Sequence, residues 1–168
     1  MKWDAFNLCF GELDFHIKVG NLDKFKESIR QITSNNQNIK LTYIDGKACK
    51  EAYEVFKEFS NKLKFPTYFG YNWDALEECL TDLDWLQAEG HIIFIEHANC
   101  FSNLNLTDRN NLLEVLRTVV HDWRNGRDYK VPIKFPMPFE IILHCSDGEQ
   151  NMLIKNLEAL DIVYELLI

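Results

Sequence analysis

Residues 65–85 read Phe65-Pro-Thr-Tyr-Phe-Gly-Tyr-Asn-Trp-Asp-Ala-Leu-Glu-Glu-Cys-Leu-Thr-Asp-Leu-Asp-Trp85 and change from an aromatic loop into a short acidic helix. Proline disfavours helical backbone in the residue before it, so Phe65-Pro66 ends the preceding element. Gly70 allows a tight or left-handed backbone within the loop. Asn72 is a suitable helix N-cap, and Asp74 then falls in the first turn, where the helix dipole favours a carboxylate. The pattern therefore predicts a helix that begins directly after Asn72.

This predicted helix has an apolar face and an acidic face. The apolar positions recur at helical spacing and are expected to face a core, and they are Ala75, Leu76, Cys79, Leu80 and Leu83. The opposite face is expected to carry Trp73, Asp74, Glu77, Glu78 and Asp82. Because Asp74, Glu78 and Asp82 are four residues apart, like charges stack along one side and weaken an isolated helix. A helix that keeps such a row is a candidate binding surface for a cationic partner.

The acidic charge of the chain is concentrated around this helix. No Lys or Arg lies between Lys64 and Arg109, and this segment holds eight acids, at positions 74, 77, 78, 82, 84, 89, 96 and 108. The remaining chain holds 18 acids (26 minus 8) and all 18 basic residues, so the central segment carries the net charge of −8. Aromatic rings beside charge are typical of binding hot spots. The other interpretation is that the acidic face is only a solvated surface.

The order of residue types around the loop resembles a known family. The string Pro66-x-Tyr68-Phe69-Gly70-x-Asn72-x-Asp74-Ala75-Leu76-x-Glu78-Cys79-Leu80 is similar to the signature of the barstar family, intracellular inhibitors of the secreted ribonuclease barnase. The resemblance covers about residues 39–146. It implies a parallel sheet with packed helices and a basic ribonuclease as partner. Carboxylates would fill the cationic active site of that ribonuclease in place of RNA phosphate, an interaction that raises association rates and weakens with salt.

The resemblance also implies which residues contact the partner. By position, the family's contact residues correspond to Tyr68, Asn72, Asp74 and Glu78, of which Glu78 replaces an aspartate. The family's helix tryptophan becomes Glu77, Trp85 is expected to supply an aromatic contact after the helix, and a further acidic contact falls near Thr118, which is not acidic. These departures indicate a nuclease other than barnase. The full predicted partner-binding set is Tyr68, Gly70, Asn72, Trp73, Asp74, Glu77, Glu78, Asp82 and Trp85.

Each of these residues also has a purely structural interpretation. Gly70 serves a backbone turn, Asn72 serves as an N-cap, and Asp74 complements the helix dipole. Tyr68 and Trp85 are large enough to belong mainly to the core, and Phe69 is expected to be a core residue.

The rest of the chain alternates predicted strands with predicted helices. Strands are expected over 13–19, 39–44, 91–97, 139–145 and 162–167, and helices over 22–33, 48–63, about 107–125 and 149–160. The proline-rich stretch 131–138 is expected to be an extended connector. Strands that alternate with helices imply an α/β fold with a mostly parallel sheet and right-handed crossovers. We expect one domain over 1–168, in which 1–38 add a strand and helix and 147–168 add a helix and strand.

Composition limits the class of protein. With 46% hydrophobic residues the chain is expected to fold, and a pI near 5.1 argues against direct nucleic-acid binding. The N-terminus does not resemble a signal peptide, and the apolar runs are too short to cross a membrane. We therefore expect a cytoplasmic protein, with a monomer favoured. The five cysteines are expected to be buried free thiols, and they are Cys9, Cys49, Cys79, Cys100 and Cys145.

No catalytic motif stands out, so an enzyme, a cofactor and a metal site are not expected. The sequence has no Gly-rich phosphate loop, HExxH, CxxC or GxSxG. His97 and His144 each lie near a Cys at a predicted strand end, which leaves a metal or Cys–His site as an alternative to structural histidines. A glycosidase pair of Asp74 and Glu78 would need a cleft between the carboxylates. The main alternative to a ribonuclease inhibitor is an interaction module of the same fold that binds another basic protein.

Overall fold

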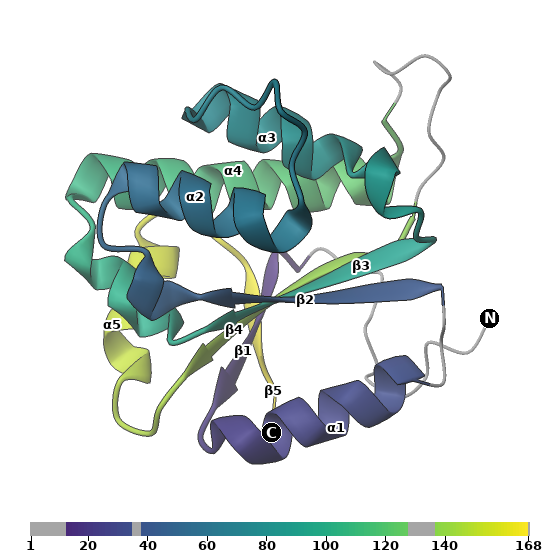
Figure 1. Cartoon of the computed structure of the whole chain (residues 1–168). Coiled ribbons are helices and arrows are strands. Elements are labelled where there is room, and N and C mark those ends of the chain that lie inside the picture. The colour runs from purple at the N-terminus through teal and green to yellow at the C-terminus, as the bar shows by residue number, and fades with distance from the viewer. Residues whose placement is uncertain (1–12, 35–37, 128–136, 168) are drawn as a thin grey trace.

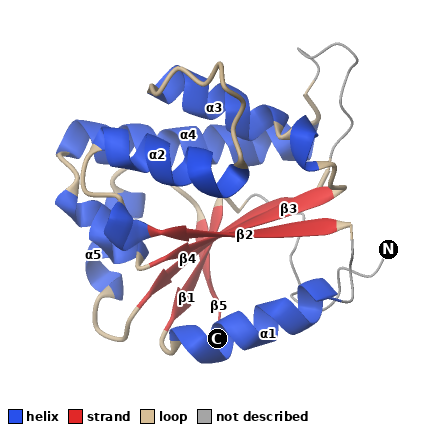
Figure 2. Cartoon of the chain, viewed as in Figure 1, coloured by secondary structure: helices blue, strands red, loops and turns tan. Residues whose placement is uncertain are grey.

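A parallel β-sheet with helices on both faces forms the centre of the computed structural model (Figure 1, Figure 2). The structure describes residues 13–34, 38–127 and 137–167. Within these residues the sheet has five strands in the order β2-β3-β4-β1-β5, and every neighbouring pair is parallel. The strands are β1 (Phe15–Val19), β2 (Ile39–Asp45), β3 (Gly90–Glu96), β4 (Phe139–Cys145) and β5 (Tyr164–Leu167). The predicted α/β fold with a parallel sheet is confirmed.

The helices divide between the two faces of the sheet. Helices α2 (Ala52–Leu63), α3 (Trp73–Asp82) and α4 (Leu106–Asn125) cover one face, and α1 (Leu22–Ser34) lies on the opposite face (Figure 1). Along the strand order, the connection from β1 to β2 runs toward one edge of the sheet, and the later connections, from β2 to β3, β3 to β4 and β4 to β5, run toward the other edge. Because such crossovers are right-handed, the first helix and the later helices must take opposite faces.

Most predicted elements are present, with shifted ends. The helix predicted over 48–63 begins at Ala52, because 46–48 form a short 3₁₀ turn in which the Asp45 side chain accepts a hydrogen bond from the Lys47 amide. Helix α5 (Gln150–Glu158) is shorter than the predicted 149–160. Residues 131–136 of the proline-rich connector, residues 35–37 of the polar loop and Cys9 lie outside the described residues.

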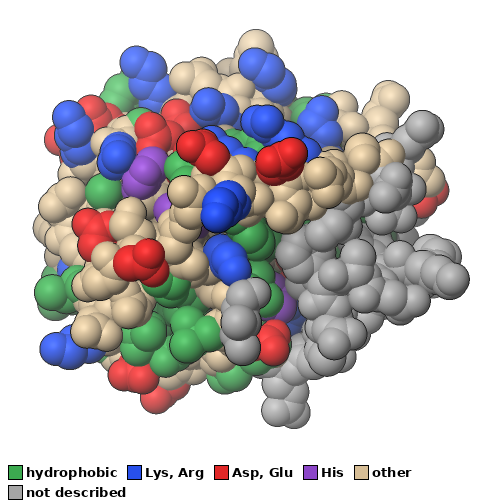
Figure 3. Space-filling model, turned by 90° about the horizontal axis from the view of Figure 1, so that it is seen from below, with side chains coloured by type: hydrophobic (Ala, Val, Ile, Leu, Met, Phe, Trp, Pro, Cys, Tyr) green, Lys and Arg blue, Asp and Glu red, His purple; other side chains and the backbone are tan. Residues whose placement is uncertain are grey.

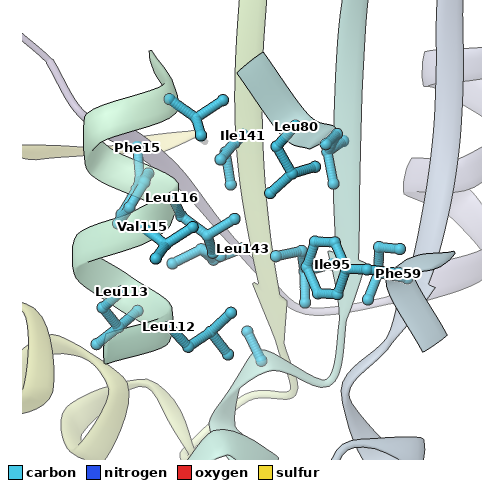
Figure 4. Packing of buried hydrophobic residues seen from close by; sticks show 14 of the residues in the cluster. Phe15, Phe59, Leu80, Ile95, Leu112, Leu113, Val115, Leu116, Ile141 and Leu143 are labelled. Atoms are coloured by element: carbon cyan, nitrogen blue, oxygen red, sulfur yellow. The ribbon is translucent and has the colours of Figure 1, made fainter. Parts of the chain in front are cut away.

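Alternate side chains of the strands point to opposite faces of the sheet, and a separate hydrophobic core forms on each face. On the α2–α4 face, Phe59, Leu80 and Leu116 pack over a sheet surface that includes Ile95, Ile141 and Leu143 (Figure 4). On the α1 face, a smaller cluster forms from Phe25, Ile29, Ile92, Phe94 and Ile142. Strands β3 and β4 are buried along almost their whole length, which explains their nearly continuous apolar sequences.

The added ends of the chain extend the same sheet. Strand β1 pairs with β4 on one side and with β5 on the other. Buried polar groups reinforce this junction: Glu140 Oε2 lies 3.1 Å from both His16 Nε2 and Arg124 Nη2. The buried Asp14 carboxylate accepts a hydrogen bond from the Val163 amide at 2.8 Å. The terminal elements are therefore tied to the central strands by specific polar contacts as well as by strand pairing.

The face that carries α1 has a mixed charge. Lys and Arg side chains lie beside Asp and Glu over the described part of this face (Figure 3). Some of these charges are paired, as in the contact of Lys26 Nζ with Glu96 Oε1 at 2.5 Å. Among the described helices, none combines the length and apolarity that a membrane span requires.

His91 at the start of β3 gives the fold a dependence on pH. The residue is 2% exposed, and its ring centroid lies 5.1 Å from that of Trp123. Burial, and then the charges of Arg127 and Lys40, lower the pKa of His91 from 6.5 to about 4. Because the folded-state pKa lies below the unfolded value, the neutral ring stabilises the fold fully above pH 6.5. This contribution is lost as the pH falls from 6.5 toward 4.

We expect the His91→Phe variant to lose less stability on acidification than the wild type. Going from about pH 7.5 to about pH 5, the wild type should lose about 2 kcal/mol more of its free energy of unfolding, because the unfolded chain protonates His91 first. Urea unfolding at the two pH values measures the difference. Equal losses in the two proteins would show that His91 does not govern this dependence.

Candidate functional site

The loop before α3 and the cap of α3 form one hydrogen-bonded unit. The Ala75 amide donates to Asn72 Oδ1 at 2.8 Å, which confirms the predicted N-cap. The Asn72 side-chain amide in turn donates to the Gly70 carbonyl at 3.3 Å. Asp74 lies in the first turn, as predicted. The start of α3 is therefore set by residues next to it in the sequence.

Replacing Asn72 with Ala is expected to lower the free energy of unfolding by about 1 kcal/mol, because the first turn of α3 loses its side-chain acceptor. Urea unfolding measures the loss. Asn72→Ser keeps an acceptor at the same position and should retain most of the stability. If Ser proves as destabilising as Ala, capping does not explain the effect.

Of the tight or left-handed backbone predicted at Gly70, the structure shows the close approach and not the left-handed conformation. The left-handed backbone is found one residue later, at Tyr71, whose φ is 50°. A Cβ atom added at Gly70 would lie 3.1 Å from Asn72 Nδ2 and 3.5 Å from Ala75 Cβ. Gly70 is thus explained by the close approach of the loop to the helix cap, and Tyr71 carries the backbone strain.

The two faces of α3 largely follow the predicted pattern. Leu76, Cys79 and Leu80 are buried, and Leu83 after the helix is buried as well. Trp73 was expected on the acidic face, and this prediction is wrong: the residue is half-buried and meets the Phe56 ring edge-on at 4.7 Å between centroids. The reason is tertiary, because α2 lies beside the start of α3 and covers this position.

Exposed carboxylates line the outer side of α3. Asp74 and Glu78 are exposed, and neither has an ion-pair partner among the described residues. Glu77 and Asp82 are half-buried. The row of like charges predicted from the spacing is therefore present, with Asp74 and Glu78 as its most accessible members.

Helix α4 contributes an acid that was not predicted from the sequence. Burial, and then the charges of Asp122 and Asp74, raise the pKa of Glu77. Asp122 of α4 therefore lies close to the acidic helix, because α3 and α4 pack against each other. The family resemblance predicted an acid near Thr118, one helical turn earlier. Asp122 could have been found from its spacing, because residues four apart lie on the same side of a helix and Asp122 follows Thr118 by four positions.

Two of the predicted aromatic contacts differ in exposure. Tyr68 is 69% exposed. Desolvation, and then the charges of Cys79, Asp82 and Glu78, raise the pKa of Tyr68. Trp85 is half-buried, and its indole N–H donates to the Leu63 carbonyl at 2.9 Å. Tyr68 is thus available to a partner, whereas Trp85 also caps the end of α2.

Side chains at the end of α4 hold the last turn of α3. The Trp123 indole N–H donates to the Leu80 carbonyl at 2.9 Å, and Arg127 Nη1 donates to the Thr81 carbonyl at 2.8 Å. The Arg127 guanidinium lies 3.5 Å from the centroid of the Trp123 ring. Both ends of α3 are therefore fixed, the first by its own N-cap and the last by α4 and Arg127.

The histidines considered as a second site have structural surroundings. The rings of His97 and His144 lie 5.9 Å apart, and His144 Nε2 donates to the Gly20 carbonyl at 2.9 Å. Burial lowers the pKa of His144 and raises that of Cys145 to about 11, so neither group is charged near neutral pH. The described His, Cys, Asp and Glu residues form no group arranged to hold a metal ion. None of the four described cysteines is in a disulfide; Cys49, Cys79 and Cys145 are buried as predicted, whereas Cys100 is only half-buried.

A comparison with known protein families finds a match over the central part of the chain. Residues 39–137 match the family described as barstar (barnase inhibitor), which is more than half of the 168 residues. The chain belongs to the barstar family. The matched residues contain β2, β3 and all of α2, α3 and α4, so the acidic helix lies inside the barstar region. Membership implies a protein partner. No curated protein sequence matches the chain significantly.

The fold of this chain is similar to parts of solved structures of other proteins. The ORC2 protein of Aeropyrum pernix in its ADP form is 13% identical, with a TM-score of 0.58, over 94% of this chain and 43% of that chain. A Walker-type ATPase of Pyrococcus abyssi is 15% identical, with a TM-score of 0.56, over 92% of this chain and 49% of that chain. This barstar-family chain thus spans less than half the length of either structure. At such low identity the similarity shows the fold alone.

Proposed function

We propose that this barstar-family protein is an immunity-type inhibitor that binds the basic active site of a secreted or toxin ribonuclease and has no catalytic activity of its own. The observation that carries the proposal is the pair of exposed carboxylates on α3, Asp74 and Glu78, which have no cation beside them in the described residues. Both carboxylates and the exposed ring of Tyr68 lie inside the residues that match the family.

Simple electrostatics explains how such a surface inhibits a ribonuclease. An active site that holds RNA phosphate is lined with cationic side chains, and carboxylates can occupy the same positions. Opposite fields speed the encounter of the two proteins, and added salt screens this effect. Because both ends of α3 are held by hydrogen bonds, the backbone that carries the carboxylates is ordered before the partner arrives, which lowers the entropy lost on binding.

The residues around the carboxylates suggest a partner other than barnase. Glu78 is one methylene longer than the aspartate that it replaces, and Glu77 stands where the family has a tryptophan. A surface with more charge and one ring fewer favours a more strongly basic or differently shaped active site.

An ATPase is not proposed, although the similar solved structures include a Walker-type ATPase. Their similarity extends only to the fold. In this chain only Gly20 and Asn21 separate β1 from α1, and the sequence contains no Gly-rich phosphate loop.

Inhibition of a panel of secreted and toxin ribonucleases, barnase included, tests the proposal. The protein should inhibit at least one member at equimolar concentration, compete with RNA substrate, and inhibit less strongly at high salt. The matched control is the same assay with an acidic ribonuclease, which should not be inhibited. If no basic ribonuclease in the panel is bound, the function must be sought instead in a basic partner that is not a nuclease.

A further inference from the structure

Two tyrosines from separate elements form an exposed pair beside the carboxylate site. Tyr53 lies in the first turn of α2, and Tyr71 lies in the loop before α3. Their rings are stacked, with centroids 5.6 Å apart and planes 26° apart. Tyr53 is 58% exposed and Tyr71 is 46% exposed. Helix α2 thus contributes an aromatic surface that lies outside the predicted site.

The Tyr71 ring is held in place from below. Its φ of 50° is unfavourable for a bulky residue, so the surrounding contacts must maintain it. The ring centroid lies 4.8 Å from that of Phe69, which is 7% exposed. Phe69 in turn meets Phe65 at 4.9 Å. An exposed ring supported in this way loses little conformational entropy when a partner binds.

In the part of the chain that the structure describes, the exposed faces of the two tyrosines are not covered by cations. Among the described residues, cationic groups lie over Phe25, Tyr43 and Trp123, but none lies over Tyr53 or Tyr71. Because Tyr71 covers one face of Tyr53, much of the exposure of Tyr53 belongs to its other face and its edge. Tyr71 also directly precedes the cap of the helix that carries Asp74.

We propose that the stacked Tyr53–Tyr71 pair receives an arginine side chain of the basic protein partner. This inference rests on the proposed function, since that function requires a partner with many cationic side chains. A guanidinium is planar and weakly hydrated, so it stacks on an aromatic ring better than a lysine ammonium does. The interface would then extend from α3 onto α2 and would select for arginine at one position of the partner.

The first test uses the ribonuclease of the panel that the wild type inhibits most tightly. Tyr53→Ser should weaken its binding about tenfold, mainly through faster dissociation, whereas Tyr53→Phe keeps the ring and should bind like the wild type. Met152→Gln, which changes an exposed side chain on α5, serves as the control and should have no effect. Because Tyr53 is exposed, all three variants should fold, and thermal unfolding checks this.

The second test identifies the partner group. Each arginine of that ribonuclease near its active site is changed to lysine, and binding is measured with wild type and Tyr53→Ser. One replacement should weaken wild-type binding and have no further effect on Tyr53→Ser. Coupling to no arginine, or unchanged binding by Tyr53→Ser, overturns the inference while inhibition by the wild type still stands. Binding to no ribonuclease at all overturns the proposed function and this inference with it.

Discussion

Replacing Asp74 with Asn and Glu78 with Gln together is expected to weaken binding to the inhibited ribonuclease about a hundredfold. Both side chains are exposed and unpaired among the described residues, so the loss comes from missing attraction to the partner. Most of the effect at low salt should be a slower association rate. The double variant should also show a weaker salt dependence than the wild type, because fewer charges remain to be screened.

A stability measurement distinguishes a direct loss of binding from a loss caused by unfolding. Glu78→Gln alone removes a like charge four residues from both Asp74 and Asp82, so its thermal stability should equal or slightly exceed that of the wild type. The expected gain in free energy of unfolding is about 0.3 kcal/mol. Binding and stability are thus expected to change in opposite directions, which is typical of a residue kept for function.

Helix α1 offers a matched control on the opposite face of the sheet. Asp23 and Glu27 are exposed, four residues apart, and Asp23 lies in the first helical turn, as Asp74 does in α3. Asp23→Asn/Glu27→Gln changes the net charge equally and should leave inhibition within about threefold of the wild type. If both double variants lose affinity equally, net charge rather than the α3 surface explains binding.

Replacing Arg127 with Ala is expected to lower the free energy of unfolding by about 3 kcal/mol. The change leaves the buried Thr81 carbonyl without its 2.8 Å donor and removes the guanidinium from the Trp123 ring. Burying a guanidinium is itself unfavourable, which offsets part of this loss. The lost contacts prevail because Thr81 is 1% exposed and its carbonyl loses the donor that satisfies it.

Because Arg127 contacts the end of α3, we expect the Arg127→Ala substitution to destabilise that part of the structure most. Amide hydrogen exchange should accelerate in the last turns of α3 more than in α1, which lies on the other face of the sheet. Urea unfolding measures the total loss, and Lys24→Ala, which changes an exposed cation on α1, is the control. Uniform acceleration across the fold would contradict a specific role in holding α3. Inhibition by Arg127→Ala should also weaken, because the carboxylates are then less ordered.

Features that depend on neighbours in the sequence were predictable. The cap at Asn72, the row of acids on α3 and the apolar strands β3 and β4 all follow from residue type and spacing over one or two turns. The alternation of strands and helices was sufficient to predict a parallel sheet, because right-handed crossovers leave few other arrangements. The family resemblance was also visible in the sequence, because the residues that carry it lie close together between Pro66 and Leu80.

Features that depend on contacts between residues far apart in the sequence could not be predicted. Trp73 was expected on the acidic face, but α2 covers it through Phe56. Tyr53 lies 18 positions before Tyr71 and joins it only because the loop before α3 packs against the start of α2. Arg127 reaches the end of α3 from beyond α4, across 46 positions.

The sequence by itself determined the fold class, the family and the acidic helix with its cap, because local backbone preferences and the spacing of apolar residues decide those. Only the tertiary structure decided the strand order and which side chains share a surface with that helix. Such contacts join residues far apart in the chain, and their formation depends on how whole elements pack, which no short stretch of sequence specifies.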